Sequence, residues 1–198
     1  AGKSIAVVSD AGMPSICDPG EDLIKEVRSI GLNIICIPGP CAALTALVTS
    51  GLPSSKFVFE GFLPKKKLDR EKLLIEISKN EKTTILFESP HRLKKLLNQL
   101  KEYCGEEREI RVCRELTKKF EEHIGNNIQE VIAYFEGKEV LGEITVVING
   151  IKQVSKFDNR ELKKELNDLI NAGLSLSAAS KYLAKKNNLK KSLIYNMY

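Results

Sequence analysis

The segment that most constrains the fold is residues 7–20, VVSDAGMPSICDPG, where an apolar run ends in a loop rich in Gly and Pro. This pattern predicts a buried strand followed by a binding loop, because Gly and Pro let backbone amides and carbonyls approach a ligand closely. Residues 33–43, NIICIPGPCAA, repeat the pattern. Small ligands bind at the carboxyl ends of strands in α/β sheets, so the pair of loops favours a ligand site over two ordinary strand-to-helix turns.

Seven motifs follow one another along the chain: VSDAGMPSICDPG (8–20), PGPCAALTAL (38–47), GLPS (51–54), FEGFLP (59–64), FESPHR (87–92), RELTKKFEE (114–122) and GEITVVINGI (142–151). This ordered set resembles the tetrapyrrole methylase superfamily, and within it the branch of small-subunit rRNA cytidine-2'-O-methyltransferases. The resemblance spans nearly the whole chain. It implies an S-adenosylmethionine-dependent methyltransferase that modifies a cytidine ribose near the decoding centre, with small-subunit rRNA or the small (30S) ribosomal subunit as partner.

The resemblance also implies a homodimer and further strands upstream of residue 1. About the first third of the intact protein is therefore expected to be missing, and the chain alone is not expected to be a competent enzyme. Two other functions stay open at this stage. One is a methylase of small tetrapyrroles on the same fold, and the other is a non-enzymatic RNA-binding factor for ribosome assembly.

The apolar patterns predict an α/β protein with a tetrapyrrole-methylase-like fold in three parts. Residues 1–53 are expected to form part of a parallel α/β cofactor-binding domain, with strands at 5–8 and 34–37 around a helix at 22–30. Residues 54–151 are expected to form a second α/β domain with a mixed sheet. Its predicted strands are 57–59, 84–87, 110–113, 121–124 and 144–148, and its predicted helices are 69–79, 90–103 and 128–135.

Charge is divided unevenly along the chain. Residues 1–151 carry 21 Lys and Arg against 22 Asp and Glu, whereas residues 152–198 carry 10 against 4. A basic tail on a neutral body is typical of proteins that bind nucleic acid, although a solvated helical tail would have the same composition. The preferred phosphate contacts are Lys185, Lys186, Lys190 and Lys191.

The tail, residues 152–198, is predicted to form three short helices of helix-turn-helix type. Leu162, Leu166, Leu169 and Ile170 share the inner face of the first helix. Ser177 is expected to cap the second helix, and the remaining inward residues are Ala178, Tyr182, Leu183, Leu193, Ile194 and Met197.

Cellular location and metal binding follow from what the composition lacks. No apolar run approaches the roughly 18 residues of a membrane span, and no basic-then-apolar signal begins the chain, which favours a cytoplasmic protein with no membrane partner. The five cysteines form no CxxC pair, so neither a disulfide framework nor a zinc site is indicated. They are expected to be small buried residues.

The two Gly/Pro loops contain no Lys or Arg, which favours a ligand without phosphates. The AGKS at 1–4 precedes a strand and lacks the upstream glycine of a phosphate-binding loop. The resemblance places S-adenosylmethionine against Ala11, Gly12, Met13, Ile16, Cys41 and Ala42, with Glu88 and the segment 111–113, centred on Val112, as further wall positions. Met13 departs from the family, where Thr or Asp is common. Asp10 contacts the cofactor or caps its own loop.

Methyl transfer to a 2'-hydroxyl needs alignment of the reactants and removal of one proton. Candidate proton acceptors or orienting groups are Glu60, Glu88, Glu115 and Lys118, each at a strand end or in the following loop. Structural salt bridging is the alternative for each of them. His91 follows Pro90 at a helix start that Ser89 is expected to cap, and it is predicted to be a helix-terminus residue and not a base; His123 is a weaker candidate still.

Overall fold

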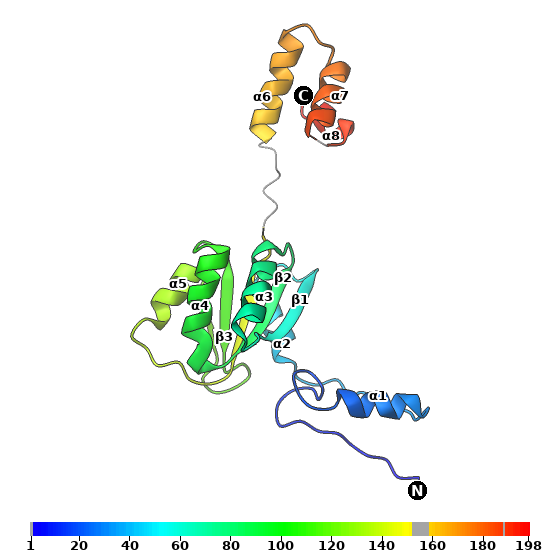
Figure 1. Ribbon diagram of the computed structural model, residues 1–198, viewed down its shortest axis with the longest axis vertical. Helices are drawn as coiled ribbons and strands as arrows, with labels where there is room; N and C mark the ends of the chain where they lie inside the picture. Colours follow the sequence, from blue (N-terminus) through cyan, green and yellow to red (C-terminus); the bar gives the residue numbers. More distant parts are fainter. Residues whose placement is uncertain (1, 152–158, 188) are drawn as a thin grey trace. The chain divides into compact units, whose positions relative to one another are not determined.

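The computed structural model describes residues 2–151, 159–187 and 189–198 (Figure 1). The chain divides into two compact units, Ala1–Ile151 and Lys152–Tyr198, and each has its own apolar core. In the described residues, no helix combines the length and the apolar character that crossing a membrane requires.

The first unit is built on one mixed sheet with the strand order β1-β2-β5-β3-β4. The strands are β1 (Phe57–Phe62), β2 (Thr83–Glu88), β3 (Ile110–Arg114), β4 (Glu122–Ile124) and β5 (Ile144–Ile148). β1 pairs with β2 in parallel, whereas β5 runs antiparallel to both β2 and β3. The predicted α/β class and mixed sheet are confirmed, with strand bounds close to those expected.

Helices cover both faces of this sheet because its strands alternate between two cores. Leu86, Val112 and Val146 point to one core, which α3 (Lys67–Lys79), α4 (Pro90–Cys104) and α5 (Ile128–Phe135) cover (Figure 1). Ile85, Cys113 and Val147 point to the other core, against α2 (Ala42–Ser50).

Helix α4 shows how the sequence sets this packing. It begins with Pro90, whose missing N–H is not needed at a first helical position, and it is followed by Gly105 with φ +83°. Its buried residues recur at helical spacing, at Leu93, Leu96, Leu97 and Leu100. Each buried leucine contributes about 1.5–3 kcal/mol to stability relative to an exposed one.

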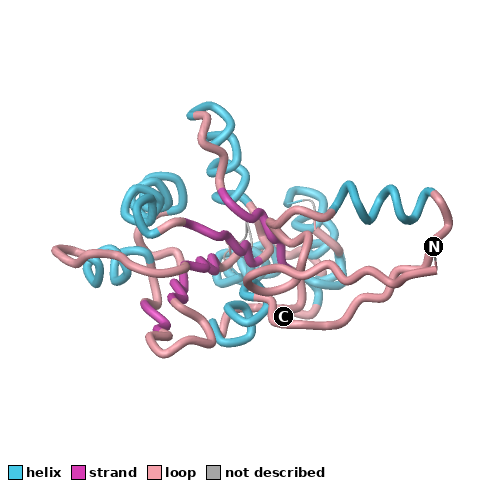
Figure 2. The backbone as a smooth tube through the Cα atoms, turned by 90° about the horizontal axis from the view of Figure 1, so that it is seen from below, coloured by secondary structure: helices cyan, strands magenta, loops and turns pink. Residues whose placement is uncertain are grey.

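The strands expected at 5–8 and 34–37 are absent from the structure, and these residues run as loop on either side of α1 (Glu21–Ser29) (Figure 2). Their apolar side chains are exposed: Ile5 is 89% and Ile35 is 81% accessible. Apolar β-branched residues favour a strand only where a neighbouring strand completes the hydrogen-bond ladder, and neither segment has one here. Helix α1 is present as predicted but buries none of its residues.

Helix α2, AALTALVTS, was not among the helices predicted from the sequence. Two threonines support it from within, since Thr45 Oγ1 donates to the Cys41 carbonyl at 2.9 Å and Thr49 Oγ1 donates to the Thr45 carbonyl at 2.8 Å. The helix ends at Gly51, whose φ of +72° suits a left-handed helix cap.

The second unit consists of α6 (Asn159–Asn171), α7 (Leu176–Asn187) and α8 (Lys191–Tyr195). Its core confirms the predicted inward residues Leu162, Leu166, Leu183 and Ile194, with Leu169, Ile170 and Met197 partly buried, and adds Ala179 and Ala184.

Three predictions for the second unit are wrong. Ser175 caps α7, and not Ser177, since Ser175 Oγ accepts from the Ala178 amide at 3.3 Å. The helix therefore starts two residues earlier than expected. Ala178 and Tyr182 are exposed, because Ala179, Leu183 and Ala184 form the inner face of α7. Leu193 is 49% exposed because Ile194 occupies the inner position of α8.

Candidate active site

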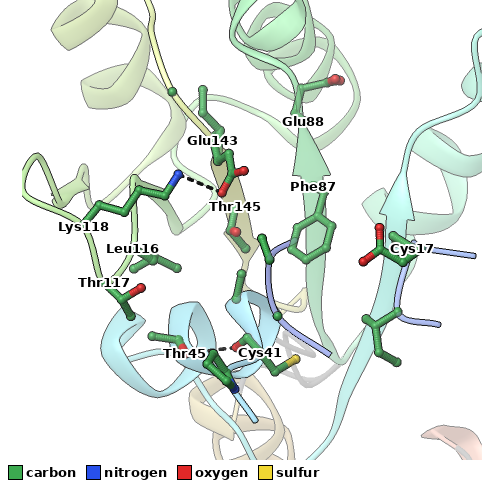
Figure 3. A pocket seen from close by; sticks show the side chains of 18 of the residues that line it. Cys17, Cys41, Thr45, Phe87, Glu88, Leu116, Thr117, Lys118, Glu143 and Thr145 are labelled. Carbon is green, nitrogen blue, oxygen red and sulfur yellow. Dashed lines mark hydrogen bonds and ion pairs between the residues drawn. The ribbon is translucent and has the colours of Figure 1, made fainter. Parts of the chain in front are cut away.

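A cavity of ≈ 550 Å³ lies at one edge of the sheet in the first unit (Figure 3). β1, β2 and β3 end at this edge and β5 begins there, because Ile144 pairs with both Glu88 and Arg114. Four chain segments supply most of the wall: 11–18, 40–45, 116–118 and 142–145.

The two Gly/Pro loops meet at this cavity. Gly12 has φ +76°, and a Cβ added there would lie 3.2 Å from the Pro40 carbonyl oxygen, so the close approach of the loops requires glycine. Six of the predicted cofactor residues line the cavity together: Ala11, Gly12, Met13, Ile16, Cys41 and Ala42. Asp10 is exposed and Val112 is buried in the core, and neither lines it.

The amino end of α2 also faces the cavity, through Cys41, Ala42 and Thr45. Cys41 occupies the N-cap position without a side-chain cap hydrogen bond. The first amides of a nine-residue helix therefore present partial positive charge to whatever lies in front of them.

An aromatic group forms the wall on the β1 and β2 side. Phe87 packs edge-to-face on Phe59 and Phe62, with ring centroids 5.0 and 5.7 Å away, and both Phe62 and Phe87 line the cavity. Such packing fixes the orientation of the rings and keeps this wall apolar.

On the opposite wall, Glu115, Lys118 and Glu143 form a cluster of charged contacts that we call the clamp. Glu115 Oε1 accepts from the Glu143 amide at 2.8 Å and lies 3.0 Å from Lys118 Nζ. Lys118 Nζ in turn lies 3.1 Å from Glu143 Oε2 (Figure 3). A Cβ at Gly142 would come within 2.5 Å of the Glu115 side chain, so this position requires glycine. The clamp ties the loop after β3 to the residues that precede β5.

Backbone strain is concentrated in the same loop. Glu115 and Thr117 have φ of +51° and +65°, a left-handed conformation that costs a non-glycine residue about 1–3 kcal/mol. The Glu115 amide donates to the Glu143 carbonyl at 2.9 Å, and the clamp adds its side-chain contacts. The surrounding contacts thus hold a conformation that the loop would not adopt alone.

The clamp also sets the charge of Lys118. Hydrogen bonds to Glu115 and then Glu143 raise the pKa of Lys118 above its usual 10.5. The Glu143 amide, followed by the Lys118 ammonium, lowers the pKa of Glu115 below its usual 4.5. Lys118 therefore stays a cation near neutral pH and lines the cavity, whereas Glu115 stays a carboxylate and lies behind it.

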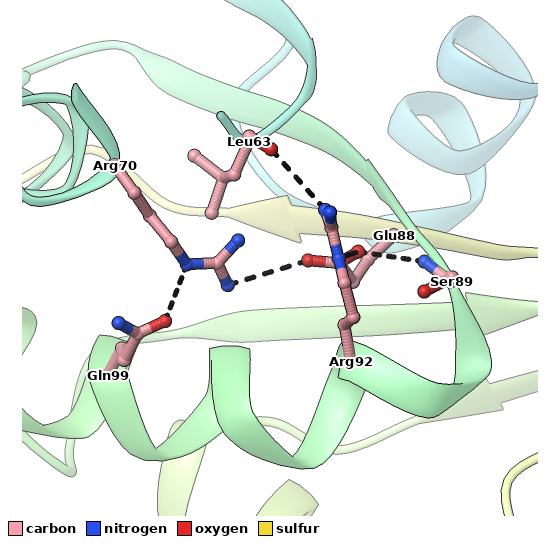
Figure 4. A network of polar contacts seen from close by, with 6 residues as sticks. All are labelled: Leu63, Arg70, Glu88, Ser89, Arg92 and Gln99. Atoms are coloured by element: carbon pink, nitrogen blue, oxygen red, sulfur yellow. Dashed lines mark hydrogen bonds and ion pairs between the residues drawn. The ribbon is translucent and has the colours of Figure 1, made fainter. Parts of the chain in front are cut away.

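Glu88 is engaged in a buried polar network (Figure 4). Its side chain is fully buried, and Oε1 accepts from Arg92 Nε at 2.7 Å and from the Ser89 amide at 2.9 Å. Oε2 lies 3.5 Å from Arg70 Nη2, which makes an ion pair but not a formed hydrogen bond. Burial lowers the pKa of Arg70, which also donates to Gln99 at 2.7 Å. These contacts favour a structural role for Glu88.

The remaining candidates lie off the cavity. Glu60 sits at a register shift in β1, half-buried, and does not line the cavity. His91 is exposed in the first turn of α4. Ser89 occupies the N-cap without the side-chain bond expected of it, and the Arg92 amide donates to the Ser89 carbonyl at 3.0 Å. His123 Nε2 lies 2.8 Å from Glu121 Oε1.

The cysteines are more varied than expected. Cys113 is buried, and burial raises the pKa of its thiol to about 11, which makes it a poor nucleophile. Cys17 and Cys36, however, are exposed, because the loops that carry them are not covered by a sheet. Among the described residues, no cluster of His, Cys, Asp and Glu has the composition of a metal site.

The basic candidates of the second unit differ in their surroundings. Lys186 contacts Glu165, which raises the pKa of the lysine, and Lys191 donates to Ser177 at 2.8 Å. Lys185 and Lys190 are exposed. Lys185 and Lys190 are therefore better placed than Lys186 to contact a polyanion.

Sequence reasoning missed several wall residues. Asp18 and Glu143 are cavity-lining carboxylates, and Thr45, Phe62 and Phe87 complete the wall. The sequence places Glu143 directly before a predicted strand, and this position was the available signal. Only the antiparallel pairing of β5 with β2 shows that this strand begins at the cavity edge.

Comparison with known proteins shows the family of this chain. Residues 1–132 match the family model described as Tetrapyrrole (Corrin/Porphyrin) Methylases. Over its whole length the chain is 41% identical to a Synechocystis sp. protein and 39% identical to a Bacillus subtilis (strain 168) protein, each named Ribosomal RNA small subunit methyltransferase I, and it spans 71% and 69% of their lengths.

The solved structure of the methyltransferase CobJ shares the fold, with a TM-score of 0.53 at 19% identity over 71% of this chain and 62% of that one. Members of this family take their methyl group from S-adenosylmethionine. The family model matches two thirds of the chain, and the relatives are about 40% identical over the whole length of this chain. The chain therefore belongs to the tetrapyrrole methylase family, in the group of the small-subunit rRNA methyltransferases.

Proposed function

We propose that this protein transfers a methyl group from S-adenosylmethionine to the 2'-oxygen of a cytidine in small-subunit rRNA, near the decoding centre, in the cytoplasm. The observation that carries the proposal is the cavity in which both Gly/Pro loops meet the Lys118 wall, in a chain 41% identical to a protein named Ribosomal RNA small subunit methyltransferase I. The structural likeness to CobJ supports the fold and does not distinguish the substrates.

The cavity fits the cofactor in size and chemistry. Its ≈ 550 Å³ lies within the usual range for small-molecule sites. Ala11, Gly12 and Met13 would hold the cofactor through backbone groups and small apolar surfaces, and Ile16 would extend that surface. The amino end of α2, behind Ala42, suits the carboxylate of the cofactor because helix amides and the helix dipole stabilise an anion.

Bound S-adenosylmethionine supplies a methyl group that its positive sulfur already activates. The protein must then align the 2'-hydroxyl, exclude water and let the hydroxyl proton leave as the new O–CH₃ bond forms and the S–CH₃ bond breaks. The apolar wall of Phe62 and Phe87 serves to exclude water.

Of the four residues suggested for catalysis, Glu88 and Lys118 line the cavity, and only Lys118 has its charged group accessible, with 44% side-chain exposure against 0% for Glu88. A lysine with a raised pKa does not accept a proton near neutral pH. We therefore assign Lys118 to stabilising negative charge that develops on the attacking oxygen, and Glu115 to positioning Lys118.

The test is cofactor binding to the intact protein by calorimetry, followed by transfer of labelled methyl groups to small ribosomal subunits that lack the modification, because the chain alone is not expected to be a competent enzyme. We expect the intact parent protein to bind S-adenosylmethionine. Gly12→Leu should abolish binding while leaving the protein folded, because a side chain at φ +76° and 3.2 Å from the Pro40 oxygen displaces the loop. Equal cofactor affinity of parent and variant would refute this placement of the site.

A further inference from the structure

We infer that Phe62, Lys65, Lys66 and Lys67 form an RNA-binding surface on the first unit, at the mouth of the cavity; the inference rests on the proposed function. We call these four residues the β1-edge surface. The recognised partner is single-stranded RNA, read through its phosphates and one unstacked base.

The topology places this surface at the site. β1 ends at Phe62, on the same sheet edge as the cavity, and Phe62 lines the cavity while remaining 53% exposed. The next residue, Leu63, is buried, and its carbonyl accepts from Arg92 Nη2 at 3.3 Å. The chain is thus anchored immediately before it emerges with three consecutive exposed lysines.

The charge of this segment is not balanced locally. Residues 62–68 contain three lysines and no acid, with Glu60 before the segment and Asp69 after it. Lys67 lies 3.8 Å from Glu71 but keeps 87% of its side chain exposed. The lysines also stand at the start of α3, where the helix dipole disfavours cations. A bound phosphate would offset both the repulsion among the three lysines and their unfavourable interaction with the helix dipole.

The chemistry fits RNA that enters the cavity as a single strand. Sequence-specific RNA recognition uses unstacked bases that pack on aromatic side chains, with lysines along the backbone phosphates. Phe62 is held edge-to-face by Phe87, with an interplanar angle of 62°, and so offers a fixed and accessible ring. Nucleotides flanking a target inside the cavity would pass over this edge.

The test compares two triple variants of the full chain. K65Q/K66Q/K67Q removes the lysines of the β1-edge surface. K56Q/K79Q/K82Q removes three exposed lysines that precede β1, end α3 and precede β2, at the opposite edge of the sheet. Both variants lose the same charge and keep the basic second unit. Binding of a short cytidine-containing oligoribonucleotide is measured as a function of salt.

We expect K65Q/K66Q/K67Q to bind this RNA at least about tenfold more weakly at ~0.15 M salt, with a slope of log K against log salt shallower by about 2, since each phosphate contact to a single strand contributes about 0.7. The control variant should show a clearly smaller change in both quantities. Phe62→Leu should weaken binding without changing the slope, because stacking releases no counterions.

Equal RNA affinities of the two triple variants overturn the inference. So does a loss of binding to poly-glutamate without a loss of binding to RNA, which would assign the surface to an acidic protein. Calorimetry with S-adenosylmethionine separates this result from the proposed function. Unchanged cofactor affinity in K65Q/K66Q/K67Q shows that the variant is folded, whereas an intact parent protein that binds no cofactor refutes the proposed function and leaves the surface result standing.

Discussion

Glu88→Ala is expected to lower the free energy of unfolding of the first unit far more than the loss of an exposed ion pair would. The substitution removes the carboxylate that faces two guanidinium groups. The Arg70 side chain is only 8% exposed, so its charge cannot be rehydrated without moving the loop and helix around it. Arg92 is 29% exposed and can turn to water. The stability cost therefore arises chiefly at Arg70.

Breaking a buried ion pair by removing one partner costs about 3–5 kcal/mol. Glu122→Ala is the matched control, because its pair with Arg114 has side-chain exposures of 19% and 40% at 2.9 Å. Exposed pairs contribute about 0.2–1 kcal/mol. At about 2–4 °C per kcal/mol for a unit of this size, Glu88→Ala should lower Tm by roughly 6–20 °C.

The measurement is urea unfolding and thermal melting of the parent and the two variants. The double variant R70M/E88L should recover much of the loss, because it removes both charges and keeps the volume apolar. If Glu88→Ala and Glu122→Ala shift the unfolding midpoint equally, the network does not hold the fold. A variant that retains parental stability but loses methyl transfer would instead return Glu88 to the catalytic residues.

The clamp should stabilise the protein in a pH-dependent way, because the pKa of Glu115 in the folded state lies below its usual 4.5. The stabilising contribution of the Glu115 carboxylate is present at neutral pH and is lost as the pH falls through the folded pKa. The difference in urea midpoint between parent and Glu115→Gln should thus be larger at pH 7 than at about pH 3, and an equal difference at both would contradict the clamp. In the second unit, K185Q/K190Q should weaken RNA binding more than K186Q/K191Q, in a salt-dependent manner, because Lys186 and Lys191 already have partners; equal losses in a binding titration would show that these contacts do not matter.

Continuous apolar runs were the best predictors of the fold. β5, ITVVI, is buried at every residue, so its limits could be read from the sequence alone. The same reasoning gave strands at 5–8 and 34–37, which the structure does not form. The runs look alike, but β5 has a pairing partner on each side, whereas those two segments have none. Strand formation therefore depends on neighbouring strands as well as on the residues of the segment itself.

The sequence also located the Gly/Pro loops of the cavity, because glycine is required wherever backbones approach closely. It could not separate structural from chemical carboxylates. Glu88 and Glu115 both follow or end a strand and look equivalent in the sequence. Only the fold shows that Arg70 and Arg92 surround one, while the other sits behind Lys118 in a strained loop.

The Glu88 network and the Glu115 clamp differ in how rigidly they hold their sides of the cavity wall. The Glu88 network is shielded from solvent, so salt barely weakens it, and it holds residues 88–90 in place. The Glu115 clamp is more exposed, with 44% of Lys118 and 72% of Glu143 accessible, and it restrains a loop with two strained residues. Salt screens such contacts, and the negative charge that we assign Lys118 to stabilise on the attacking oxygen would compete with Glu143 for the Lys118 ammonium. Adjustment on substrate binding should therefore occur in residues 115–118, while the aromatic wall on the β2 side keeps the geometry of the apoprotein.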